Sequence, residues 1–320
     1  MKLFRNLARA VVIAAVACSA IAQDSTSQPI RVIIPFGPGS GTDNIARPLF
    51  DALSRELNQS FTIDNRPGAS GIVAAEAVAR AAPDGKTLLF TSNTLFSINP
   101  SLFKKLPYDP VKDFRPISSV TTAYYLLVVR KEMPVNNVAE LIAWIKANPG
   151  TASYGWGAAV SQMAGADFVN RIGVPVVGVP YKSSPQAATD LIGGQLSFMF
   201  LDLAAGLPII SGERMKLLAV TTPKRVSLFP KVPTMAESGI SDFEVFAWTG
   251  LFAPAGTPDR LVNRLAVAIK TVMANPELQK KYENCCSPMP ILGEAEFSDY
   301  LKRDRAVWAK RASIAGIVPE

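Results

Sequence analysis

IIPFGPGSGTDNIAR, residues 33–47, combines a short apolar run, a glycine-rich turn and the start of a helical pattern. The apolar run predicts a buried strand, and glycines at every second position allow the chain to turn tightly. Thr42 or Asp43 is the predicted N-cap of the helix that follows. Because a helix N-terminus has unpaired N–H groups and the positive end of the helix dipole, this turn is suited to bind an anion.

The same strand–turn–helix pattern continues along the chain. Further strands are predicted at residues 61–65, 87–92 and 123–130, with a helix before each of the first two and loop-like residues before the third. Such alternation favours a parallel α/β sheet. A second α/β unit follows in the middle of the sequence, and residues 244–254 predict a strand that returns to the first unit.

Residues 1–22 have the pattern of an export signal. Three basic residues precede an apolar stretch too short to span a bilayer, and Ala20-Ile21-Ala22 matches a cleavage signal. The alternative is a lipoprotein acylated at Cys18, although the leucine that usually precedes such a cysteine is missing. Cleavage would lower the formal net charge from +7 to +4, and we expect the mature protein in the periplasm.

Several functional classes lack the residues they need. The chain contains no histidine, which excludes Ser-His-Asp and Cys-His nucleophiles and histidine metal sites. No Gly-Lys-Ser/Thr follows the glycine-rich turn, and no dense block of Lys and Arg suggests nucleic acid. Cys285 and Cys286 are adjacent, and a disulfide between neighbours is strained, so none is assumed. We expect no metal, no cofactor and no nucleic-acid partner.

Two further stretches could face the same cleft. In YKSSPQA, residues 181–187, a strand again leads into polar residues and a helix start. Lys182 is either a counter-charge there or an ordinary solvated lysine. In YGWGAAVS, residues 154–161, glycines flank Trp156, whose ring either forms a cleft wall or packs in the core.

Eight segments of the chain, taken in order, resemble the Bug-type periplasmic receptors of the tripartite tricarboxylate transporter group. They are PFGPGSGTD (35–43), NRPGASG (65–71), APDG (82–85), LPYDP (106–110), VPYKSSP (179–185), GGQ (193–195), VPTMAESG (232–239) and APAGTP (253–258). Each motif is weak alone, but the ordered set is specific and covers the whole chain beyond the export signal.

The resemblance implies a two-lobed α/β fold, that of a type II periplasmic binding protein or Venus flytrap. The chain would cross the hinge twice, near residues 124–128 and 246–250. Residues 1–22 would be the signal peptide, residues 23–124 and 248–320 domain 1, and residues 125–247 an inserted domain 2.

The resemblance also implies a ligand site built from three loops. The implied ligand-binding residues are Phe36, Gly39, Ser40, Thr42 and Asp43 from the first loop, Tyr181, Ser183, Ser184 and Ala187 from the second, and Trp156, Gly157, Ala158 and Ser161 from the third. Ser92, Asn93, Asp202 and Trp248 are further cleft candidates by position. Two departures stand out, because Ser40 replaces a usual glycine and the loop after Gly155 is shorter and lacks the family's histidine.

We therefore expect a monomeric receptor that captures a small organic carboxylate, either a dicarboxylate or an aromatic one. Its lobes would close on the ligand and deliver it to the subunits of a membrane transporter without any reaction. One alternative is a secreted hydrolase or lyase that uses Asp43, Asp202 or Lys182. The other is a ligand-loaded sensor that docks on a membrane kinase.

Overall fold

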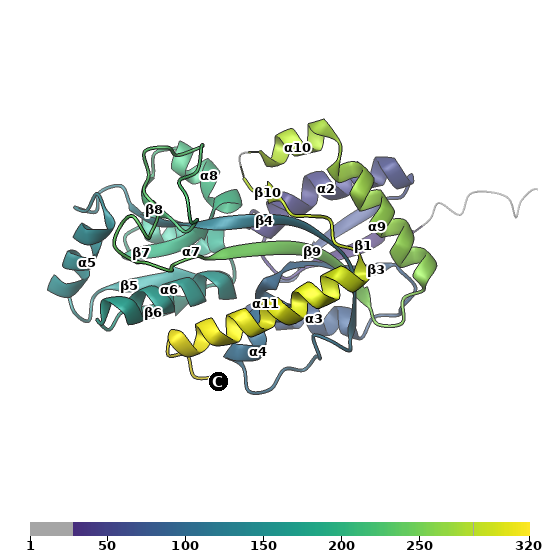
Figure 1. Cartoon of the computed structure of the whole chain (residues 1–320), viewed down its shortest axis with the longest axis horizontal. Helices are drawn as coiled ribbons and strands as arrows, with labels where there is room; N and C mark the ends of the chain where they lie inside the picture. Colours follow the sequence, from purple (N-terminus) through teal and green to yellow (C-terminus); the bar gives the residue numbers. More distant parts are fainter. Residues whose placement is uncertain (1–27, 284) are drawn as a thin grey trace, which may run out of the picture.

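The computed structural model describes residues 28–320 except residue 284, so the predicted signal peptide and Cys18 lie outside the described residues. The strands form a ten-stranded sheet in the order β2-β1-β3-β9-β4-β7-β5-β6, with β8 and β10 also paired to β4. Helices cover this sheet in two lobes (Figure 1). The two-lobed α/β class predicted from the sequence is confirmed.

The first lobe is built on three parallel strands, β1 (Ile30–Ile34), β2 (Phe61–Asn65) and β3 (Thr87–Ser92). All six residues of β3 are buried, as expected for a strand covered on both faces. The covering helices are α2 (Gly41–Leu57), α3 (Ile72–Ala79), α9 (Asp259–Met273) and α10 (Pro276–Tyr282). Shorter pieces are the 3₁₀ turn Ala69–Gly71, the π-helical turn Thr94–Ile98, α4 (Asn99–Leu102) and β10 (Ser287–Pro288).

The second lobe, like the first, is built on three parallel strands. Strand β5 (Ser153–Trp156) pairs in parallel with β6 (Val177–Pro180) and with β7 (Phe198–Asp202). Its other elements are β8 (Met215–Val220), α5 (Val138–Ala147), α6 (Ala159–Ile172), α7 (Ser184–Ile192) and α8 (Leu203–Ser211).

Two strands pass from one lobe to the other. Strand β4 (Phe114–Arg130) pairs antiparallel with β9 (Phe246–Pro254) as far as the pair Tyr124–Phe246. From Tyr125 onward, β4 pairs instead with β7 and β8 of the second lobe. The predicted strand at residues 123–130 is therefore only the second half of β4. The residues before it, several of them polar, also belong to the strand because they pair with β9.

The last long helix, α11 (Glu294–Ile314), runs beneath both lobes (Figure 1). Phe297 and Leu301 near its start belong to the apolar core of the first lobe. Trp308 and Ala312 near its end belong to the core of the second lobe. Helix α11 thus contacts the cores of both lobes. None of the described helices is long and apolar enough to cross a membrane.

Candidate functional site

The glycine-rich turn ends in a capped helix N-terminus. Ser40 is the N-cap of α2, with extended backbone angles, and its hydroxyl accepts a hydrogen bond from the Asp43 N–H at 3.4 Å. The prediction that Thr42 or Asp43 is the cap is wrong, because both lie inside the first helical turn. Gly39, at a φ of 76°, completes the turn early enough for Ser40 to take the cap position.

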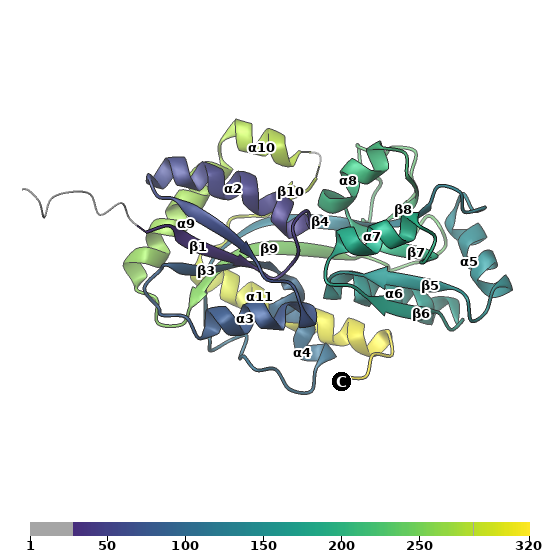
Figure 2. The ribbon, with the colours of Figure 1, turned by 180° about the vertical axis from the view of Figure 1, so that it is seen from behind.

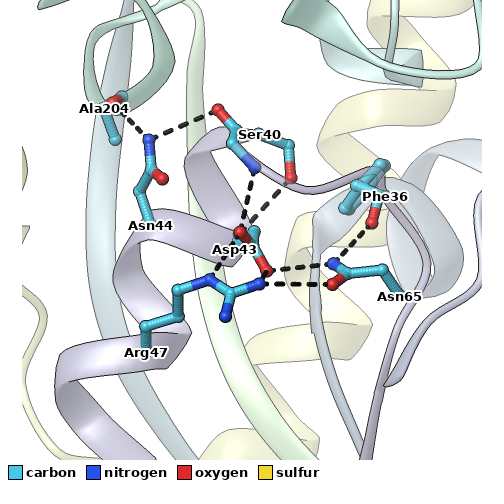
Figure 3. Close-up of polar contacts among 8 residues, drawn as sticks. Phe36, Ser40, Asp43, Asn44, Arg47, Asn65 and Ala204 are labelled. Atoms are coloured by element: carbon cyan, nitrogen blue, oxygen red, sulfur yellow. Dashed lines mark hydrogen bonds and ion pairs between the residues drawn. The ribbon is translucent and has the colours of Figure 1, made fainter. Parts of the chain in front are cut away.

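Asp43 holds this turn together from within the first lobe (Figure 3). Its carboxylate accepts hydrogen bonds from the Gly39 N–H at 2.9 Å and from the Asn65 side chain at 3.0 Å. The Arg47 guanidinium donates to both carboxylate oxygens, each at 2.9 Å. Asp43 is therefore a structural anchor whose charge is paired with Arg47, and it lines neither of the cavities described below.

An inner cavity of about 30 Å³ lies between the lobes. It is lined by Phe36, Ser40, Gly41, Thr42, Ile45, Ser92, Ala123, Tyr125, Ala158, Ser184, Asp202, Ala247 and Thr249. Four helix N-termini reach this wall, namely those of α2, α6, α7 and α8. Helix N-termini carry unpaired N–H groups and partial positive charge, so their convergence favours an anionic group.

Asp202 is the one charged residue in the described wall of the inner cavity. It caps α8, and its carboxylate accepts a hydrogen bond from the Ala205 N–H at 2.9 Å. Burial raises the pKa of Asp202 to about 6, although hydrogen bonds from Ala205 and from the Ser184 hydroxyl act in the opposite direction. The carboxyl group therefore titrates close to neutral pH.

The two lobes touch at the rim of the inner cavity. The Asn44 side chain on α2 donates a hydrogen bond to the Ala204 carbonyl on α8 at 2.9 Å (Figure 3). Gly41 approaches Asp202 so closely that a β-carbon added to it would lie 1.9 Å from a carboxylate oxygen. Figure 2 shows the N-terminal end of α2 facing α7 and α8 across the gap between the lobes. The structure is thus a closed arrangement.

An outer cavity of about 440 Å³ opens beside the inner one. It is lined by Pro35, Phe36, Gly68, Ala69, Ser70, Gly71, Phe103, Trp156, Gly157, Ala158, Pro180, Tyr181, Lys182 and Glu320. Phe36 and Ala158 line both cavities, which places the two spaces side by side. A ligand with a small polar head and a larger body fits this division.

The structure brings ten of the predicted site residues to these walls. Phe36, Ser40, Thr42, Ser92, Ala158, Ser184 and Asp202 line the inner cavity, and Trp156, Gly157 and Tyr181 line the outer one together with Phe36 and Ala158. Seven others lie outside both walls: Gly39, Asp43, Asn93, Ser161, Ser183, Ala187 and Trp248.

Trp248 lies in the core of the first lobe. Its side chain is 0% exposed, its ring packs edge-on against Phe297, and its indole N–H donates to Asp304 at 2.7 Å. The assignment of Trp248 to the cleft is therefore wrong, because its side chain points into the core.

The other residues outside the walls support the loops around the site. The Asn93 side chain donates to the Phe246 carbonyl at 3.1 Å, and the Ser161 hydroxyl donates to the Ala158 carbonyl at 2.9 Å. Ala187 is buried in the second lobe, and Ser183 caps α7 next to Gly37 of the first lobe.

Sequence reasoning missed the contribution of the crossing strands. Tyr125 from β4 and Thr249 from β9 line the inner cavity. Their neighbours in the sequence are apolar or typical of strands, so the sequence contains no local sign of a site. It also missed Phe103 and residues 68–71 in the outer wall, although the motif NRPGASG contained the signal for the latter. Cys285 and Cys286 are free thiols with their sulfurs 2.9 Å apart.

Two lobes joined by crossing strands around an enclosed cavity define the class of periplasmic binding proteins. A solved structure of the periplasmic binding protein BugD is 31% identical, with a TM-score of 0.87, over 91% of this chain and 99% of that one. The structure of Rpa4515 from R. palustris with adipate is 31% identical, with a TM-score of 0.89, over 93% and 100% of the two chains.

The particular family follows from the sequence comparisons. Residues 45–289 match the model of the tripartite tricarboxylate transporter family receptor, TctC. A UPF0065 protein of Bordetella bronchiseptica is 34% identical, in an alignment that covers 99% of this chain and 96% of that protein. The chain belongs to the tripartite tricarboxylate transporter receptor family, which confirms the resemblance drawn from its eight motifs.

Proposed function

We propose that this protein is an extracytoplasmic receptor that captures a small organic carboxylate between its lobes and delivers it to a membrane transporter. The observation that carries the proposal is the convergence of four helix N-termini on the inner cavity. Ser40 and Asp202 cap α2 and α8, whereas α6 and α7 have no side-chain cap. The free N–H groups of α6 and α7 would hold a carboxylate without a basic side chain, since the described wall contains neither lysine nor arginine. The adipate named with the similar structure of Rpa4515 supports the same ligand chemistry.

The mechanism we propose is closure of the lobes around the ligand. The boundaries between the two lobes would lie where β4 changes its pairing partners, between Tyr124 and Tyr125, and at the matching start of β9, at Phe246. Residues 125–247 would then move as the inserted lobe, and the Asn44–Ala204 hydrogen bond would form on closure. The closed monomer would present a surface made of both lobes to the transporter.

We also propose that the protein carries out no reaction on its ligand. Asp43, one candidate for catalysis, is paired with Arg47 outside the cavity. Asp202 faces the cavity, but it is engaged as the cap of α8. A docking role on a membrane kinase differs from transport only in the partner, so co-purification with transporter subunits decides between them.

The test is a thermal-shift screen of ligand-stripped protein with adipate, malate, phenylacetate and acetate, followed by calorimetry. A carboxylate that binds raises the unfolding temperature by mass action. The ligand should be recovered unchanged after long incubation, whereas turnover that is lost in Asp202→Asn would favour the hydrolase or lyase. Folded protein that binds no carboxylate would overturn the proposed function.

A further inference from the structure

The walls of the outer cavity are aromatic on both sides. Phe36 and Phe103 come from the first lobe, and Trp156 and Tyr181 come from the second. Closure of the lobes therefore brings two pairs of rings to one space. Aromatic side chains around one cavity favour a flat aromatic body, because offset-stacked and edge-to-face contacts add to the free energy of burial.

The two rings of the second lobe are held in place by their own lobe. The Trp156 ring lies against Gly178, where a β-carbon would come within 2.6 Å of it, and packs on Tyr154 at 5.3 Å between ring centroids. The Tyr181 hydroxyl donates to Asp190 at 2.8 Å. Each ring is thus held before the ligand arrives, Trp156 against the core that contains Tyr154 and Tyr181 against the core that contains Ala187, which lowers the ordering cost of binding.

The floor of the outer cavity carries no large side chain. Gly68, Ala69, Ser70 and Gly71 all have φ between 44° and 141°, a conformation that costs energy in Ala69 and Ser70. The buried Asn99 side chain holds this segment by donating to the Ser70 carbonyl at 3.0 Å. Residues 68–71 thus contribute no large side chain to the outer wall.

The charged residues of the outer wall do not select a second charge. Lys182 and Glu320 are both exposed and carry opposite signs, so neither sign dominates the described wall of the outer cavity. The body of the ligand is therefore selected by shape and apolar contact. This distinguishes the outer cavity from the inner one, where helix N-termini favour an anion.

We infer that the ligand is an aromatic carboxylate, with its carboxylate in the inner cavity and its ring between the aromatic walls of the outer cavity. This inference rests on the proposed function and chooses between the aromatic and dicarboxylate classes. The ring would lie beside Phe36 and Ala158, which line both spaces. Trp156 and Phe103 would be residues that determine specificity for the ring.

The test compares phenylacetate with cyclohexylacetate, which has the same charge and carbon skeleton but a puckered ring, and with adipate. Calorimetry on ligand-stripped protein should give phenylacetate at least tenfold tighter binding than either. Trp156→Leu should remove most of that preference, and Trp144→Leu on α5, outside both cavity walls, should preserve it. Phe103→Leu tests the facing lobe if Trp156→Leu fails to fold.

The outcomes distinguish failure of the aromatic ligand class from failure of the proposed receptor function. Equal affinity for phenylacetate and cyclohexylacetate, or tighter binding of adipate, would overturn the aromatic class while leaving a carboxylate receptor. A preference for phenylacetate that survives both Trp156→Leu and Phe103→Leu would overturn the assignment to this cavity. Binding of none of the three, nor of the other carboxylates screened, would overturn the proposed function itself.

Discussion

Gly41→Ala is the substitution that tests lobe closure most directly. An alanine β-carbon at this position would lie 1.9 Å from Oδ1 and 2.7 Å from Cγ of Asp202. Such contacts do not occur below 3.0 Å, so α2 and Asp202 would have to separate by about 1.1 Å. The clash exists only when the lobes are closed, because Gly41 belongs to the first lobe and Asp202 to the second.

The size of the effect follows from the cost of overpacking. An added methyl group in a well-packed contact costs about 1–3 kcal/mol, which corresponds to about 5- to 150-fold weaker binding if the closed form bears all of it. The open protein bears none of it, since alanine is the better helix former. Gly41→Ala should therefore weaken carboxylate binding and leave the unfolding temperature of the ligand-free protein unchanged or higher.

Substitutions at two further glycines allow the loss of affinity in Gly41→Ala to be compared with smaller effects. Gly37→Ala would place a β-carbon 2.9 Å from the Ser183 β-carbon, which needs a smaller movement than Gly41→Ala, so binding should weaken less. Gly193→Ala is the matched control, because its β-carbon would meet nothing closer than 3.5 Å. Calorimetry and thermal unfolding should rank the losses in affinity as Gly41, Gly37, Gly193. Wild-type affinity in Gly41→Ala would refute the argument that binding requires this contact.

Three other substitutions probe the closure, the buried acid and the core. Asn44→Ala removes the hydrogen bond between the lobes and a second one, of 3.3 Å, to the Gly39 carbonyl, and should weaken binding about fivefold by calorimetry; unchanged affinity would contradict it. Burial raises the pKa of Asp202 from 3.8 to about 6, so the native state holds a proton that the unfolded chain has released. At about 1.4 kcal/mol per pH unit, the unfolding free energy of the wild type should fall by about 2 kcal/mol relative to Asp202→Asn between pH 4 and pH 7 in urea titrations; parallel pH curves would contradict this. Trp248→Phe leaves Asp304 without its indole donor and should destabilise the fold by about 1–3 kcal/mol without changing affinity, and a selective loss of affinity would return Trp248 to the cleft.

Much of the fold follows from local sequence patterns. The strands β2 and β3 have the bounds expected from their apolar periodicity, because such runs bury one face or both without reference to distant residues. The start of β4 was not predictable in this way. Phe114-Arg115-Pro116 contains a proline, which suggests a loop, and only pairing with β9 makes it a strand.

The candidate site was likewise predictable from the sequence only in part. Local turn and helix-start patterns indicated that the stretches around Ser40 and Ser184 lie at helix starts, although they placed the cap of α2 at Thr42 or Asp43 and not at Ser40. Trp248 shows the opposite case. Its position on a strand leading out of the hinge suggested a cleft residue, but the direction of its side chain depends on register with β3 and β4 and on α11 behind it.

The sequence by itself determined the class of fold, the family and the three loops that surround the site, because glycine turns, helix starts and motif order are written along the chain. The tertiary structure decided which side chains share a cavity. The lobes meet at Asp202 and Gly41, which are 161 positions apart in the sequence. Their contact depends on how β4 and β9 orient the lobes, and no local pattern encodes that orientation.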